Sequence, residues 1–324
     1  MIGRDVNYGA GKEVTAGTAV AATQWFPYLS FELAPKTKTI NNESAYGNIV
    51  RTNETSLLGE WSEGELEAKL ATQNAGMILL GAFGTVVNST NADTSAAVFN
   101  HTYTINQNVN GQSLTFVKKD SIETLAYALG RVDEWQLSME LDDYVKYTAK
   151  ILAKKQVTTT ATVAYPTDLT EFVAKHMSVK TATTEAGLAA ASNISSLESF
   201  TLTVKPNLEA DWQAGTSEPY AFSSRGYELE FEMECRYNDT VYKDAYRNGT
   251  TLALQITALN TDVTIGTSAR PGLVITAPRM NITDWAPNGN IDDPITQTMT
   301  GVIHFSPVAG KAITAVLTDT TAAW

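Results

Sequence analysis

The stretch that follows Gly226 constrains the fold of this chain more than any other segment. Glutamates alternate there with apolar residues: Glu228, Glu230, Glu232 and Glu234 are separated by Leu229, Phe231, Met233 and Cys235. Successive side chains of a β-strand point to opposite faces, so the pattern predicts a strand with a carboxylate row on one face and an apolar stripe on the other. Because like charges on one face repel, the row requires hydration or lysines on an adjacent strand.

A second alternating stretch, 134–141, predicts another strand with an acidic outer face. Glu134 and Glu140 lie on that face, and Trp135, Leu137 and Met139 lie on the other. Shorter apolar and alternating stretches predict further strands at 99–105, 145–152, 200–205, 252–259, 273–277 and 296–305. The chain is therefore expected to be mainly β.

One longer helix is expected beside these strands, over about 62–83. Ser62 followed by Glu65 resembles a capping box, and Gly84 is a suitable stop. Apolar or small side chains then recur at helical spacing: Leu66, Leu70, Ala71, Met77 and Leu80. A shorter helix is expected over 239–247.

The chain divides into four segments. Residues 1–40 form a Gly/Ala/Thr-rich N-terminal arm, which packs on a neighbour or folds back on its own domain. Its aromatic cluster gives candidate inter-subunit contacts: Trp25, Phe26, Tyr28 and Phe31. Residues 41–155 form a first β-rich module that includes the helix, the Thr-rich residues 156–170 form a linker, and residues 171–324 form a second β-rich module.

The two halves show a weak similarity. Each contains a glycine-led alternating strand with acidic residues on the outer face, after Gly130 and after Gly226. Two explanations stay open at this point: duplication of one β module, or the repetitive patterning of any β protein.

The net charge of −12 over 324 residues argues against a nucleic-acid reader, because such a protein presents a basic surface. The lone Cys235 cannot form an internal disulfide. No secretory pattern opens the chain, and its longest apolar run, around 77–83, is too short to span a bilayer. We therefore expect no membrane association and synthesis in the cytoplasm.

Catalytic and cofactor signatures are lacking in the sequence. The three histidines, His101, His176 and His304, are not at metal-ligand spacing, and we expect neither a metal nor a cofactor. The glutamate row has three interpretations: a solvated face, the wall of an aqueous pore, or a glycosidase-like carboxylate pair. The last is the weakest, because evenly spaced acids on a regular strand lack the different environments that separate an acid from a base.

The chain resembles the major tail tube proteins of long-tailed, non-contractile bacteriophages. Four segments carry the resemblance: the arm with Trp25-Phe26-Pro27-Tyr28, the run from Gly59-Glu60-Trp61 to Gly84, a hairpin beginning at 101–105, and the second-half segments 200–204, 226–235 and 246–250. The resemblance implies a β-sandwich or barrel-like core with one flanking helix and no catalytic residues.

The resemblance also implies a way of working. Subunits of that family form stacked rings, commonly hexameric, around a channel for DNA ejection, and a member with a duplicated module can form a trimeric, pseudo-hexameric ring. The implied partners are further copies, tape measure, tail terminator and distal tail proteins, and DNA only in transit. The implied location is a virion tail, assembled in the host cytoplasm. The alternative is a carbohydrate-binding or adhesive β-sandwich of a tail tip or cell surface, with Trp212 and Trp285 on the ligand.

Overall fold

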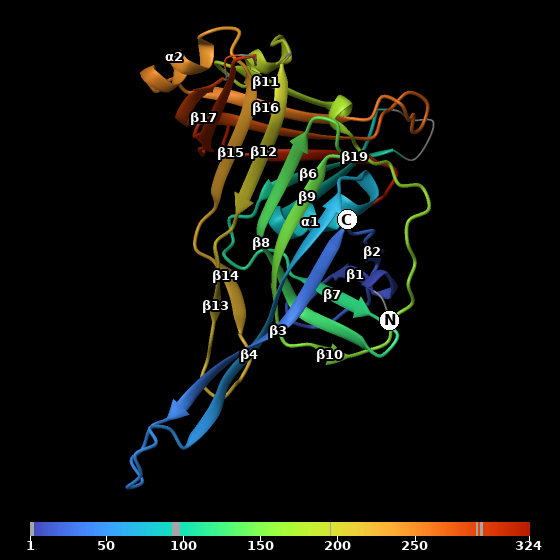
Figure 1. Ribbon diagram of the computed structural model, residues 1–324. Helices are drawn as coiled ribbons and strands as arrows, with labels where there is room; N and C mark the ends of the chain where they lie inside the picture. Colours follow the sequence, from blue (N-terminus) through green and yellow to red (C-terminus); the bar gives the residue numbers. More distant parts are fainter. Residues whose placement is uncertain (1–2, 93–97, 195, 290, 292–293) are drawn as a thin grey trace.

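The computed structural model describes residues 3–92, 98–194, 196–289, 291 and 294–324. Most of these residues lie in β-strands, as the sequence predicts (Figure 1). The elements of the first half are β1 (Asn7–Lys12), β2 (Gln24–Trp25), β3 (Ser30–Asn42), β4 (Glu54–Lys69), α1 (Thr72–Phe83), β5 (Gly84–Thr90), β6 (Phe99–Ile105), β7 (Leu114–Lys119), β8 (Thr124–Glu140), β9 (Lys146–Ala153) and β10 (Val157–Thr158). Those of the second half are β11 (Met177–Ala182), β12 (Leu197–Lys205), β13 (Leu208–Asp211), β14 (Ala221–Ser224), β15 (Glu228–Arg236), α2 (Val241–Asn248), β16 (Leu252–Leu259), β17 (Gly272–Asn288), β18 (Thr296–Ile303) and β19 (Thr314–Asp319). Short 3-10 turns occur at Gly3–Asp5, Ala174–His176 and Ala186–Ala189.

One antiparallel sheet, here called the inner sheet, runs through both halves. Its eight strands follow the order β3-β4-β9-β8-β12-β15-β18-β17. The pairing of β8 with β12 joins the first half to the second, and we call it the internal joint. One face of the inner sheet packs on the core, and the other carries polar side chains.

Two outer sheets cover the core side. The first contains β2, β1, β7, β8 and β10, and the second contains β11, β16, β17, β19, β6 and β5. The two longest strands, β8 and β17, belong to the inner sheet and to one outer sheet each. Between the layers lie the largest buried side chains, among them Trp135, Tyr103, Tyr147, Phe83 and Phe200.

The two halves repeat one order of strands and partners. The counterparts are β1 and β11, β3 and β12, β4 and β15, α1 and α2, β7 and β16, β8 and β17, β9 and β18, and β10 and β19. Wherever two of these strands pair in the first half, their counterparts pair in the second half. Strand β2 and the pair β13–β14 lie outside this correspondence. The hairpin β5–β6 has no counterpart among the described second-half elements, and it pairs with β19.

Matching irregularities set the residue correspondence between the halves. The pairing of β8 with β9 shifts register between Val132 and Glu134, and that of β17 with β18 shifts between Ile282 and Asp284. A tryptophan follows next in both strands, Trp135 and Trp285. A β-bulge is a specific structural feature, so its recurrence at one position argues for a repeated module.

The correspondence extends to residue identities. Glu65 and Glu232 are counterparts, because they lie opposite Lys150 of β9 and Thr300 of β18. Across from them, β3 and β12 align as 30–36 (SFELAPK) and 199–205 (SFTLTVK), with the same residue at four of the seven positions. The similarity that the sequence left ambiguous is therefore a repeat of strand order, register and local sequence.

The first helix is shorter than expected, and its predicted start at 62 is wrong. Residues 62–69 continue strand β4, and α1 begins at Thr72. The side chain of Asn74 accepts a hydrogen bond from the Ala71 N–H at 3.1 Å, so Ser62 and Glu65 are not a cap. Period-two alternation of acidic residues with Gly64, Leu66 and Ala68 outweighs the helical spacing, because it gives the strand one buried face.

The N-terminal segment folds back on its own domain, which was one of its two expected placements. Strand β1 pairs with β7 and β2, and β3 pairs with β4. The segment that projects from the body is instead the outer part of the β3–β4 hairpin (Figure 1). The hairpin expected after 101–105 is also wrong, since β6 pairs with β5 and β19 and β7 pairs with β1 and β8.

The acidic face of the inner sheet

The glutamate row on β15 has the predicted geometry. Glu228, Glu230 and Glu232 are exposed, and the residues between them are buried. Glu234 is half-buried, and its Oε1 accepts a hydrogen bond of 2.7 Å from the Thr296 hydroxyl. The alternation therefore places one carboxylate row in water and one apolar stripe in the core.

Neutral side chains flank most of this row. Thr201 and Thr203 of β12 lie opposite Glu232 and Glu230, and threonines of β18 lie on the other side. A single lysine, Lys205, approaches Glu230 at 3.6 Å, and both side chains are partly exposed. Exposed ion pairs contribute little, so hydration is the main condition that makes the row tolerable.

The first half carries an equivalent row that sequence reasoning missed. Glu63 and Glu65 of β4 are exposed and Glu67 is half-buried, while Leu66 and Ala68 are buried between them. These glutamates are the counterparts of Glu230, Glu232 and Glu234. The period-two signal was present in the sequence but was overridden by the helical spacing of neighbouring apolar residues.

Lysines are interleaved with the carboxylates of the first half. The Nζ of Lys150 lies 2.9 Å from Glu134 Oε2, and Lys150 is also opposite Glu65. The hydrogen bond to Glu134 and the charges of both glutamates raise the pKa of Lys150 above its ordinary value. The other predicted acid of this strand, Glu140, is exposed and lies opposite Ser199 across the internal joint.

All these carboxylates share one face of the inner sheet. Across adjacent strands, Glu65 lies opposite Lys150, and Lys150 lies opposite Glu134. Two residues further along β8, Gln136 lies opposite Thr203, and Thr203 lies opposite Glu230. A shallow hollow of about 310 Å³ lies over β12, β15 and β18 on this face, lined by hydroxyl, amide and carboxylate groups. The result is a wide polar surface and not a closed pocket.

The aromatic cluster of the N-terminal segment lies in the core. Trp25, Phe26 and Phe31 are buried, and Tyr28 is half-buried, with its hydroxyl donating to Val6 O at 2.7 Å. Tyr8 stacks against Phe31 with ring centroids 4.1 Å apart. These contacts are internal to the chain, so they fix the segment on its own outer sheet.

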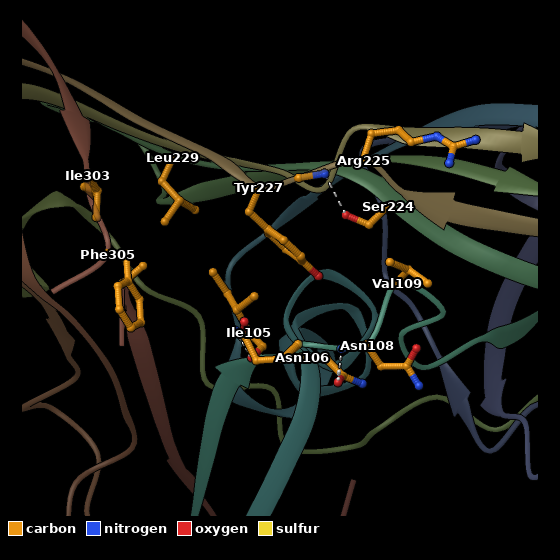
Figure 2. Close-up of a pocket in the computed structure, with 13 residues that line it drawn as sticks. Ile105, Asn106, Asn108, Val109, Ser224, Arg225, Tyr227, Leu229, Ile303 and Phe305 are labelled. Atoms are coloured by element: carbon orange, nitrogen blue, oxygen red, sulfur yellow. Dashed lines mark hydrogen bonds between the residues drawn. The ribbon is translucent and has the colours of Figure 1, made fainter. Parts of the chain in front are cut away.

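A hollow with a volume of about 440 Å³ lies where the two halves meet (Figure 2). It is lined by Asn106 and Asn108 after β6, by Tyr227 and Leu229 at the start of β15, and by Phe305 after β18. The Tyr227 hydroxyl donates to Ala82 O of α1 at 3.3 Å. No Asp, Glu, His or Cys is among the residues that line this hollow.

Two buried ionisable side chains elsewhere in the chain, Glu13 and His101, have hydrogen-bond partners. The Glu13 carboxylate accepts hydrogen bonds from Ser113, Thr115, Gly17 N and Leu129 N. Its oxygens are thus occupied by structural donors.

The buried histidine His101 is paired as well. Its Nε2 lies 2.9 Å from Asp319 Oδ1, which ties β6 to β19 across the two halves. Both this histidine and Glu13 therefore hold elements together.

The alternative functions find no constellation in the described residues. Trp212 makes an edge-to-face contact with Trp61, and Trp285 packs on Tyr237 while its indole donates to Gln297, so the two do not converge on one groove. The carboxylates of the β15 row share one exposed face, unlike a catalytic pair. No cluster of three or more potential metal ligands occurs in the described part of the chain.

Helices long and apolar enough to cross a bilayer are absent from the described residues.

Comparison with known proteins gives one family. No curated protein matches the chain. A family model described as phage tail tube protein matches residues 3–302, which is most of the 324 residues. The mainly β architecture fits the fold expected from the sequence. The chain belongs to the phage tail tube protein family.

Proposed function

We propose that copies of this structural protein assemble into rings, that the rings stack into the tube of a virion tail, and that the acidic face lines its channel. One observation carries the proposal: the inner sheet has a continuous polar face, an apolar face that is already covered, and two strands at its ends that could accept partners. Exposed strand edges are sites of pairing with further chains.

The charge of the inner sheet fits a conduit for DNA. Carboxylates stand on both halves of the face, and the chain as a whole carries a net charge of −12. Such a wall repels the phosphate backbone, so DNA passes without adhering. In this proposal DNA passes through the channel and is not bound specifically.

The repeat supports three copies in each ring. One chain supplies two modules of the same strand order, so three chains supply the six modules of a pseudo-hexameric ring. The first module comprises β1–β10, the segment near 159–170 links the modules, and the second comprises β11–β19.

The β3–β4 hairpin is the proposed contact with the next ring. Its outer part exposes apolar side chains that a free chain leaves in water: Ile40, Tyr46, Ile49, Val50, Leu57 and Leu58. Its base is braced by the β13–β14 segment, since Glu60 N–H donates to Ser217 O at 2.7 Å and Trp61 packs on Trp212. A braced hairpin with an apolar end suits docking on a neighbouring ring.

The tube's other contacts follow from its place in the particle. Further tail proteins would contact the two ends of the stack, and the tape measure protein would contact the wall of its channel. Assembly would take place in the host cytoplasm, and the finished protein would reside in the virion tail.

Charge reversal on the inner face tests the conduit. Glu230→Lys with Glu232→Lys should leave tube formation intact in electron microscopy but lower DNA delivery by reconstituted particles at least about tenfold, because lysines bind phosphate. The matched control reverses two exposed acids outside the inner sheet, Glu123→Lys with Asp168→Lys. Normal DNA delivery by tubes with the inner-face change, or a wild-type chain that never forms rings, would contradict the proposal.

A further inference from the structure

The internal joint shows how two modules of this chain fit together. Strands β8 and β12 pair antiparallel from Ser199 opposite Glu140 to Val204 opposite Trp135. On the core side of this joint, Trp135 is 1% exposed and Val204 is fully buried. On the polar side, Gln136 lies opposite Thr203, so no like charges meet there.

The counterparts of these two strands stand at the ends of the inner sheet. Strand β3 is the counterpart of β12, and the last part of β17 is the counterpart of β8. Among the described strands, only β4 pairs with β3, and only β18 pairs with 281–288 of β17. The Trp285 N–H donates to the side chain of Asp284 at 2.9 Å, as expected for an edge without a neighbouring strand.

Exposure differs sharply between the internal joint and these two edges. Leu137 and Met139 are buried at the joint, whereas 286–288 on the β17 edge are exposed. Trp285 is only half-buried, and Pro35, the counterpart of Val204, is exposed. The end of β17 and Pro35 of β3 are therefore exposed where their counterparts are buried, whereas Leu33 of β3 is buried like its counterpart Leu202.

We propose that strand β17 of one copy pairs antiparallel with strand β3 of the next copy, in the register of the internal joint. Transferring that register sets Pro35 opposite Trp285, Ala34 opposite Ala286, Leu33 opposite Pro287 and Glu32 opposite Asn288. The inference deepens the proposed function and rests on it, because it names the surface through which copies form the ring.

The transferred register is chemically compatible on both faces. On the core side, Pro35 covers the exposed part of the Trp285 ring, as Val204 covers Trp135. On the channel side, the carboxylate of Glu32 meets the amide of Asn288 and not another acid. A heterologous contact of this kind joins copies head to tail and closes into a ring when the rotation fits.

Two prolines reduce the number of backbone hydrogen bonds that this contact can form. Proline has no N–H, so Pro35 and Pro287 each remove one backbone donor from the edges. In the transferred register they do not face one another, and each faces a residue that keeps its N–H. Edge prolines also discourage pairing with unrelated strands, which suits an edge that must wait for its own partner.

The contact between copies is also weaker than the internal joint in one respect. Inside the chain, β6 of the first half pairs with β19 of the second and adds a further antiparallel strand pair across the halves. No described second-half hairpin is equivalent to β5–β6, so the contact between copies lacks this addition. The joint within a copy is thus permanent, while the joint between copies forms on assembly.

Engineered disulfides test the register. Residues directly opposite in antiparallel strands have Cβ atoms about 4.5–5.5 Å apart, close enough for a bridge after small adjustments. In assembled tubes, Glu32→Cys with Asn288→Cys and Ala34→Cys with Ala286→Cys should yield disulfide-linked multimers on non-reducing gels. The control, Glu32→Cys with Asp284→Cys, places one thiol four residues out of register, about 13 Å away, and should yield at least about tenfold less. Native Cys235 is buried and does not interfere.

The outcomes separate this inference from the proposed function. Tubes that form without linked multimers, or that link equally in the control pair, overturn the register while leaving the tube intact. A wild-type chain that never assembles overturns both. Should the cysteine variants not assemble, hydrogen exchange of the wild type decides: amides at 31–34 and at 284–286 should exchange at least about tenfold more slowly in tubes than in free chains, and unchanged exchange overturns the joint.

Discussion

The two halves of the chain share one strand order but differ in how far each is completed by the rest of the molecule. In the first half, Trp135 is buried, and α1 is buried along almost its whole length by β6, β8 and the C-terminal residues. In the second half, Trp285 is half-buried, and α2 leaves Val241 and Tyr246 exposed. The difference indicates that the strand β8 and helix α1 of the first module are completed within the chain, while their counterparts β17 and α2 are left partly open.

The largest expected effect comes from removing the counterpart tryptophans. Trp135→Ala should lower the free energy of unfolding of the free chain by about 3–5 kcal/mol, because it leaves a cavity between Phe83 and the inner sheet. Trp285→Ala should cost the free chain only about 1–2 kcal/mol, because part of its ring is already in water. Denaturant unfolding of unassembled protein measures both.

Tube formation should be affected more by Trp285→Ala than by Trp135→Ala. The Trp285→Ala chain should fold and yet lose tube formation, because its ring packs on the next copy in the proposed joint. Equal destabilisation of the free chain by both substitutions would contradict the view that Trp135 is enclosed within the chain and Trp285 is not.

A smaller difference is expected at the glycines that end the two helices. Gly84 and Gly249 both adopt a left-handed conformation, with φ of 86° and 62°. A Cβ on Gly84 would lie 2.8 Å from Asn106 Cβ, whereas one on Gly249 meets nothing within 4 Å. Gly84→Ala should therefore cost about 2–3 kcal/mol and Gly249→Ala about 1 kcal/mol in thermal or denaturant unfolding. Equal costs would show that α1 is no more tightly enclosed than α2.

The smallest effect concerns the charges of the inner sheet. Lys150 lies between Glu65 and Glu134, and its counterpart Thr300 lies between Glu232 and Asp284. Lys150→Thr should cost less than about 1 kcal/mol, because the ion pair is partly exposed, and Thr300→Lys should gain a similar amount.

The pH dependence of the Lys150 contribution has a defined sign. Its pKa is raised in the folded chain, so its stabilising contribution is complete below the ordinary lysine pKa and is lost as pH rises through the raised value. The difference between wild type and Lys150→Thr, measured by urea unfolding, should thus be present at pH 7 and vanish at strongly alkaline pH. A difference that grows with pH would contradict this assignment.

Much of the fold is predictable from alternation. The β15 strand, the Trp135 face of β8 and the short helix before Gly249 follow from local patterns, because each needs only one buried face and one exposed face. The start of α1 does not follow from a local pattern. Residues 62–69 satisfy a helical spacing and a strand spacing at once, and only the pairing of β4 with β3 and β9 selects the strand.

The candidate site is predictable in part. The carboxylate row of Glu228 to Glu234 follows from its own residues, but its companions on β4 depend on a strand that local spacing disguises. The burial of Trp25 and Phe26 in the chain's own core depends on the long-range pairing of β1 and β2, which no local pattern specifies. The continuous sheet across the halves is likewise a property of the pairing between β8 and β12.

A cryo-electron microscopy reconstruction of the assembled tube would show directly how the copies join and which face lines the channel. We expect three copies in each ring, β17 of every copy beside β3 of the next with Trp285 opposite Pro35, and Glu65 and Glu232 facing the channel. Six copies in a ring, edges that stay unpaired, or carboxylate rows on the outer surface of the tube would contradict this expectation.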